Sequence, residues 1–114
     1  MTRPRLSVVV VTLNEEDRLR ACLESVAWAD EIVVVDAESQ DKTAQIARDF
    51  TDRVIVRPWP GFAAQKNFGL AEAGGDWILA LDADEQVSPE LREEIARVLA
   101  ENGSHDGYRV PRRN

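Results

Sequence analysis

Short runs of β-branched and other apolar residues alternate with helical patterns along this chain of 114 residues. The runs cover residues 6–12, 31–36, 53–57 and 76–81, and each is too short for a buried helix. They are nearly continuous in apolar residues, which is typical of strands buried on both faces. Because strand and helix patterns alternate, we predict a single α/β domain over residues 1–114, with a mainly parallel sheet and helices on both faces.

The segments between these runs carry helix signals. Apolar residues recur at helical spacing from Leu19 to Val26, with Asn14 as the expected N-cap and acidic residues 15–17 in the first turn. Further helices are expected from about residue 41, over residues 62–73, and after a cap at Ser88. The pattern places Cys22 in the core, and "YRV" at 108–110 is expected to begin a fifth strand.

Composition narrows the classes of partner. Acidic residues outnumber basic ones 21 to 14, giving a net charge of −7, which argues against nucleic acid. No run approaches the roughly 18 apolar residues of a membrane span, and the first apolar run is too short for a signal peptide. A lone cysteine fits a reducing cytoplasm, so we expect a cytoplasmic location. Arg109, Arg112 and Arg113 leave open a peripheral contact with the inner face of the membrane.

Polar residues follow three of the predicted strands, as "TLNEE", "DAESQDKT" and "DADE". In open α/β sheets ligands bind beyond the carboxyl ends of the strands, so these segments should converge on one crevice. Asp82 and Asp84 are two residues apart, and in an extended stretch both can face one ion. Carboxylates select Mg²⁺ or Mn²⁺, which complete their shells with water and phosphates. The alternative is a solvated acidic turn leading into the next helix. We expect Glu85 to support the site indirectly or to lie on the surface, rather than to bind the ion itself.

Other residues of these segments have two interpretations each. Asp36 can accept a hydrogen bond from a nucleotide, whereas Ser39 and Asp41 could each simply cap the following helix. Thr12, Asn14 and Glu15 either cap a helix or line a nucleobase pocket.

The third helical segment and its flanks hold further candidates. Lys66, beside Gln65 and Asn67, could offset diphosphate charge or be an ordinary surface lysine. Trp59 and Phe62 lie in or beside a loop that could flank a ligand, whereas Trp28 and Trp77 are expected in the core. His105 falls in a predicted turn without partner residues, so we do not expect it to be a ligand or base.

Taken in order, "SVVVVTLNEE", "EIVVVDAESQDKT" and "AAQKNFGLAEAGGDWILALDADE" resemble the N-terminal half of glycosyltransferase family 2. The resemblance covers about residues 5–114, and "TLNEE", "QKN" and "GYRVPRRN" look most like bacterial lipopolysaccharide-core glucosyltransferase relatives. It implies a GT-A fold and inverting transfer of a hexose from a nucleotide sugar, with a UDP-sugar as the family-level expectation, to a glycan or glycolipid acceptor.

The resemblance also implies roles for individual residues. Thr12, Asn14 and Glu15 stand where the family contacts the nucleoside, and Asp36 stands where it binds the nucleobase. Lys66 and Asn67 match the Arg-Asn pair near ribose and phosphates. Asp82 matches the first aspartate of the D-x-D motif, which faces ribose and sugar, and Asp84 matches the last, which binds the metal.

Two departures from the family pattern bear on function. The family often reads D-D-G-S-x-D-G-T, whereas here Ala37 replaces an acid and Glu38 and Lys42 replace glycines. Family members also continue beyond this point and supply a general base for the acceptor hydroxyl there, so we expect the base beyond residue 114 and a truncated or naturally short chain. The alternative is a non-catalytic module that binds nucleotides or nucleotide sugars. In a truncated or naturally short chain, exposed sheet edges and apolar surface would favour self-association.

Overall fold

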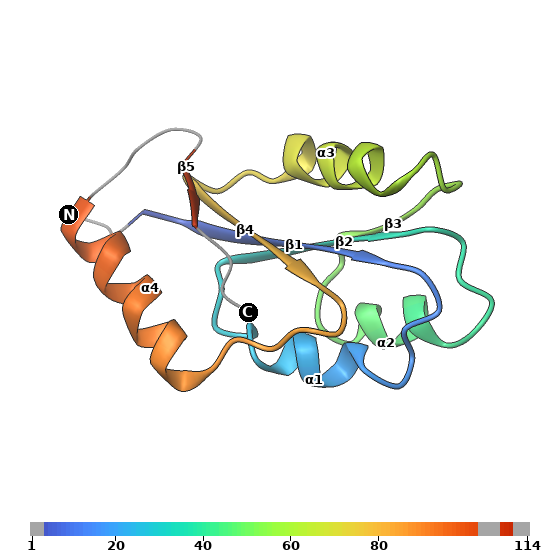
Figure 1. Cartoon of the computed structure of the whole chain (residues 1–114), viewed down its shortest axis with the longest axis horizontal. Coiled ribbons are helices and arrows are strands. Elements are labelled where there is room, and N and C mark those ends of the chain that lie inside the picture. Colours follow the sequence, from blue (N-terminus) through green and yellow to red (C-terminus); the bar gives the residue numbers. More distant parts are fainter. Residues whose placement is uncertain (1–3, 103–107, 111–114) are drawn as a thin grey trace.

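The computed structural model describes residues 4–102 and 108–110, which form a five-stranded parallel sheet with helices on both faces (Figure 1). The strand order is β3-β2-β1-β4-β5. The strands are β1 (Leu6–Thr12), β2 (Glu31–Asp36), β3 (Val54–Val56), β4 (Trp77–Asp82) and β5 (Tyr108–Val110). The helices are α1 (Leu19–Glu24), α2 (Thr43–Arg48), α3 (Phe62–Glu72) and α4 (Pro89–Asn102). The predicted α/β class and the fifth strand are therefore confirmed.

The helices divide into two layers. Helix α3 covers one face of the sheet, and α1, α2 and α4 lie on the other (Figure 1). Successive residues of β1 point into different cores: Val8 and Val10 join a large cluster with Leu19 of α1, and Val9 packs with Val33 in a smaller one. Burial on both faces is what the continuous apolar runs predicted. Cys22 lies in the larger core, as expected.

Several boundaries differ from the sequence prediction. Helix α1 begins at Leu19, because Asn14 adopts a left-handed φ of 53° and its side chain accepts a hydrogen bond from the Gln40 N–H instead of capping the helix. The acidic residues 15–17 consequently precede the helix. Helix α2 begins at Thr43, and β3 is confined to residues 54–56. Ser88 does cap α4, since its hydroxyl accepts from the Leu91 N–H at 3.1 Å.

The tryptophans expected in the core divide between two environments. Trp77 is buried, with 4% of its surface exposed. Trp28 is only half-buried and packs at the margin of the larger core. The turn expected at residues 102–107 and His105 lie outside the described residues, apart from Asn102, which ends α4.

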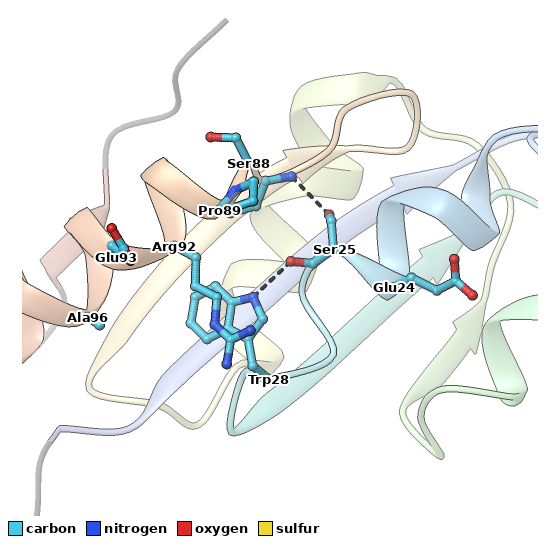
Figure 2. Close-up of a pocket in the computed structure, with 9 residues that line it drawn as sticks. Glu24, Ser25, Trp28, Ser88, Pro89, Arg92, Glu93 and Ala96 are labelled. Atoms are coloured by element: carbon cyan, nitrogen blue, oxygen red, sulfur yellow. Dashed lines mark hydrogen bonds between the residues drawn. The ribbon is translucent and has the colours of Figure 1, made fainter.

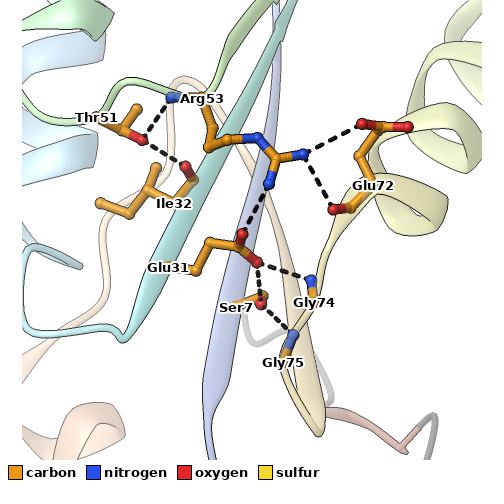
Figure 3. Close-up of polar contacts among 8 residues, drawn as sticks. All are labelled: Ser7, Glu31, Ile32, Thr51, Arg53, Glu72, Gly74 and Gly75. Atoms are coloured by element: carbon orange, nitrogen blue, oxygen red, sulfur yellow. Dashed lines mark hydrogen bonds and ion pairs between the residues drawn. The ribbon is translucent and has the colours of Figure 1, made fainter.

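A polar network connects the residues at the end of the sheet where the strands begin (Figure 3). Glu31 of β2 accepts hydrogen bonds from the Ser7 hydroxyl at 2.7 Å and from the Gly74 N–H at 2.8 Å. Its other oxygen pairs with Arg53 at 3.1 Å, and Arg53 also pairs with Glu72 at the end of α3. The network therefore attaches the connection between α3 and β4 to β2, and the end of α3 to Arg53.

Burial raises the pKa of Glu31, but the bonds from Gly74 and Ser7 and the charges of Arg53 and Arg5 outweigh it. The net result is a pKa below the ordinary carboxyl value of 4.5. A lowered pKa means that the ionised carboxylate stabilises the folded state.

Glycine at position 69 allows α3 to lie close to the sheet. A Cβ atom there would stand 2.5 Å from Cγ1 of Val9 and 3.1 Å from Cγ2 of Val35. Real Cβ atoms do not approach carbon so closely, so a side chain at this position would force the helix away from β1.

We predict that Gly69→Ala lowers the free energy of unfolding by about 1–3 kcal/mol, because the overlap with Val9 outweighs the better helix propensity of alanine. Urea unfolding would measure the change. Gly74→Ala is the matched control: its Cβ would meet only Glu31 Oε1 at 3.8 Å, so it should stay close to the parent. Equal stability of the two variants would contradict the close packing of α3.

We also predict that Glu31→Gln flattens the loss of stability in acid. The contribution of Glu31 is fully present above its unfolded pKa near 4.5 and disappears as the pH falls through its lower folded pKa. Unfolding free energies from pH 7 to 3 should therefore converge between parent and variant at the acid end. Glu101→Gln, an exposed change of the same kind on α4, should keep the parent profile. A constant gap between parent and Glu31→Gln would contradict the prediction.

Candidate functional site

A cleft of about 240 Å³ opens where β1 and β4 end. The two strands are adjacent in the sheet, with Val11 of β1 beside Asp82 of β4. The segment before α3 closes a third side. The cleft is lined by Val11, Thr12, Leu13, Glu15, Trp59, Phe62, Asp82, Ala83 and Asp84. It thus contains four of the residues predicted from sequence to bind the donor or its metal.

The two aspartates of "DADE" are held by a tight turn after β4. The Glu85 N–H donates to the Asp82 carbonyl at 2.9 Å, and the Glu85 carboxylate accepts from the Asp82 N–H at 2.9 Å. Ala83 between the aspartates is buried, whereas Asp84 is exposed. Glu85 therefore acts on the backbone of the turn, consistent with the indirect role anticipated for it.

The carboxylates around this edge create a strongly negative local field. The thiol of Cys22, under the turn, responds to it: burial, and after it the nearby negative charges, together raise the pKa of this thiol to about 12. These charges belong to Glu85, Asp84, Asp82 and Glu15. A bound cation would relieve this repulsion.

The carboxylates of the cleft fit a divalent ion that takes few protein ligands. Within residues 4–102 and 108–110, no group of three or more His, Cys, Asp or Glu side chains is arranged to hold a metal. A complete protein cage of the calcium or structural zinc type is therefore absent from the described part. Asp82 and Asp84 lining one cleft suit Mg²⁺ or Mn²⁺, which draw further oxygen ligands from water and phosphate.

Asp36 has a different setting from the one expected of a ligand-binding carboxylate. Only 1% of its surface is exposed. Its oxygens accept from the Thr12 hydroxyl at 2.6 Å, the Ser39 hydroxyl at 2.6 Å and the Ser39 N–H at 2.8 Å. This carboxylate therefore joins β1 to the loop after β2, and the Thr12 hydroxyl serves the same junction.

The loops after β1 and β2 are bound to each other along their length. The Asn14 N–H donates to the Ser39 hydroxyl at 2.7 Å, and the Glu15 N–H donates to the Thr43 hydroxyl at 2.8 Å. Asp41 receives the Glu16 N–H at 3.2 Å and also binds Thr43 at the start of α2, and the Thr43 hydroxyl is the main cause of the lowered pKa of Asp41. These bonds hold the two loops together.

At two positions this chain has another residue where the family has glycine. One of the two adopts a backbone conformation that favours glycine. Glu38 has a φ of 58°, in the left-handed region. Lys42 has a φ of −86°, which any residue adopts. The departure at 38 therefore puts strain into the loop, whereas the departure at 42 does not.

Helix α3 brings one of its two expected residues toward the cleft. Lys66 lines a small hollow next to it, together with Phe62 and Asp82, and its amino group lies 5.9 Å from the centre of the Phe62 ring. Asn67 is exposed and lines neither space.

Two features were not identified from the sequence. Leu13, between the conspicuous polar residues of "TLNEE", lines the cleft and is 43% exposed. Gln65 is fully buried, and neither atom of its side-chain amide has a hydrogen-bond partner among the described residues. The signal for Gln65 was its position one turn before Gly69, on the side of α3 that faces the sheet.

A larger hollow of about 440 Å³ lies between α1 and the start of α4 (Figure 2). Trp28 forms its floor, but the indole is already engaged: Arg92 lies 5.2 Å over the ring, and the indole N–H donates to the Ser25 carbonyl at 2.8 Å (Figure 2). The strand-end carboxylates are absent from its lining. We therefore assign the candidate site to the smaller cleft.

Among the described residues, no helix combines the length and the apolar character required to cross a bilayer.

Comparison with curated proteins identifies several similar glycosyltransferases. An uncharacterized glycosyltransferase of Rickettsia bellii is 43% identical over 97 residues, which are 84% of this chain and 33% of that protein. The lipopolysaccharide core biosynthesis glycosyltransferase LpsC of Rhizobium meliloti is 39% identical over 113 residues, 95% of this chain and 42% of LpsC. The chain thus spans about a third to two fifths of the length of these relatives.

Solved structures show the same fold. S. aureus TarS 1–349 in complex with UDP-GlcNAc superposes with a TM-score of 0.70 at 29% identity, covering 85% of this chain and 31% of TarS 1–349. Mannosyltransferase PcManGT from Pyrobaculum calidifontis, in complex with GDP-Man and Mn²⁺, gives 0.66 at 29% identity, covering 75% and 29%. The GT-A fold implied by the resemblance is therefore confirmed.

The model of the family described as Glycosyl transferase family 2 matches residues 7–112, which is nearly the whole chain. This chain therefore belongs to glycosyl transferase family 2.

Proposed function

We propose that this chain binds the nucleotide-sugar donor of a metal-dependent, inverting glycosyltransferase. The observation that carries the proposal is the cleft at the ends of β1 and β4, where Asp82 and Asp84 lie with Thr12 and Glu15. The complexes of TarS with UDP-GlcNAc and of PcManGT with GDP-Man and Mn²⁺ support it, because each of them matches most of this chain.

Each residue of the cleft has a proposed task. Asp84, exposed at the tip of the turn, would hold the divalent ion, and Asp82 would face the ribose and the sugar. The ion supplies a Lewis acid for the departing diphosphate. Lys66 adds a positive charge beside Asp82. Thr12, Asn14 and Asp36 would act mainly by holding the loops that border the nucleoside, since their polar groups already bond within the chain.

The relatives support a proposal for the acceptor and the parent reaction. LpsC is named for lipopolysaccharide core biosynthesis, and this supports transfer of a hexose to a cell-envelope glycan such as lipopolysaccharide core. An inverting transfer needs a general base beside the acceptor hydroxyl, and we place that base beyond residue 114. We propose that the reaction takes place on the cytoplasmic side of the membrane.

We predict metal-dependent nucleotide binding that requires Asp84. Calorimetric titration of UDP and of GDP with Mn²⁺ should give saturable heats for at least one of them, and chelation should abolish the signal. Asp84→Asn removes the negative charge that faces the ion, so it should weaken binding at least about tenfold, or ~1.4 kcal/mol.

The matched control is Asp52→Asn, the same change at an exposed position outside the cleft. It should bind as the parent does. Binding that ignores both the metal and Asp84→Asn would contradict the metal role, and a folded chain that binds neither nucleotide would overturn the proposed function.

A further inference from the structure

Exposed apolar side chains gather at the candidate cleft. Among the described residues, four large hydrophobic side chains are strongly exposed, and three of them line this cleft. They are Leu13, Trp59 and Phe62, exposed by 43, 45 and 47%. Single exposed apolar residues are ordinary on protein surfaces, but convergence on one cleft indicates a ligand that has apolar surface of its own.

The backbone around Trp59 is unusually restricted for a surface loop. Trp59 stands between Pro58 and Pro60, whose rings fix φ on both sides of it. Gly61 then takes a φ of 114°, and Phe62 begins α3. Because this segment has little conformational freedom to lose, a ligand that covers Trp59 would bind at a small entropic cost.

The position of the two aromatic side chains relative to the aspartates bears on which part of the donor they contact. A nucleotide sugar presents base, diphosphate and sugar in sequence, and the aspartates mark the metal and diphosphate. Trp59 and Phe62 belong to the segment leading into α3, which packs mainly on β1 and β2. The aspartates, by contrast, follow β4, on the other side of β1 from β2.

The reaction itself constrains the orientation of the donor. The sugar must meet an acceptor, so it has to stay accessible while the donor is bound. The nucleoside is part of the leaving group and is not attacked, so side chains can cover it. A planar base has two apolar faces, and aromatic side chains bind such faces by stacking.

We propose that Trp59, supported by Phe62 and Leu13, is the platform on which the base of the donor stacks, and that Trp59 thereby determines donor affinity. This inference rests on the proposed binding of a nucleotide sugar. Stacking tolerates any base, so the platform serves both uracil and guanine, and selection between them lies with other groups.

The test compares the binding of a nucleotide, which has a nucleobase, with the binding of pyrophosphate, which has none. Trp59→Ala should weaken Mn²⁺-dependent binding of UDP or GDP by about tenfold to a hundredfold, the loss typical of removing one stacking partner. Binding of Mn²⁺ with pyrophosphate, which keeps the diphosphate but has no base, should change less than about twofold. Trp59→Phe should retain most of the nucleotide affinity, because it keeps an aromatic face.

Tryptophan fluorescence gives an independent readout. Nucleotide binding should quench the parent and leave Trp59→Phe unquenched. Trp28→Phe is the matched control, because Trp28 lies in the other hollow under Arg92; this variant should be quenched like the parent. Thermal unfolding of each variant would verify folding, and the exposure of Trp59 leads us to expect little change.

Three results for Trp59→Ala would contradict its role as a stacking platform. The first is an equal loss of affinity for nucleotide and pyrophosphate, and the second is no loss of affinity for either. The third is a larger loss of affinity for UDP-glucose than for UDP, which would place the Trp59 ring against the sugar. If nucleotide still binds in a manner that depends on Asp84 while Trp59 has no effect, the platform fails and the proposed function stands. If the folded parent binds no nucleotide, both fail together.

Discussion

The parallel pairing of β1 with β2 on one side and β4 on the other is the constraint on which the rest of this structure depends. Its register sets Thr12 beside Asp36 and Val11 beside Asp82. Because both neighbours run in the same direction as β1, three strands deliver their polar ends to one edge. A slip of one residue in either pairing would turn valines of one core into the other core and shift the polar strand ends relative to one another.

The strands and the larger helices were predictable because their signals are local and repeated. Continuous β-branched runs led to β1, β2 and β4, and Ser88 before Pro89 marked the start of α4. The start of α1 was not predictable in the same way. Asn14 has the residue type of an N-cap, but its side chain bonds to Gln40, a partner 26 residues away that no local pattern reveals.

The same distinction applies to the candidate site. Asp82 and Asp84 could be placed from the sequence, since a strand end and a spacing of two residues suffice. The setting of Asp36 could not, because its buried bonds to Thr12 and Ser39 depend on how two loops meet. Leu13 was missed for a different reason. A single apolar residue among polar ones forms no sequence pattern, and only the fold places it in the cleft that Trp59 also lines.

The polar network of Ser7, Glu31 and Arg53 (Figure 3) lies where the strands begin, whereas the cleft lies where β1 and β4 end. The contacts that secure the connection between α3 and β4 are thus physically separate from the side chains that meet a ligand. This separation has an evolutionary consequence. Substitutions around Leu13 and Trp59 can accumulate without disturbing the contacts that hold the sheet in register. A fold arranged in this way can change what its cleft binds while keeping its stability.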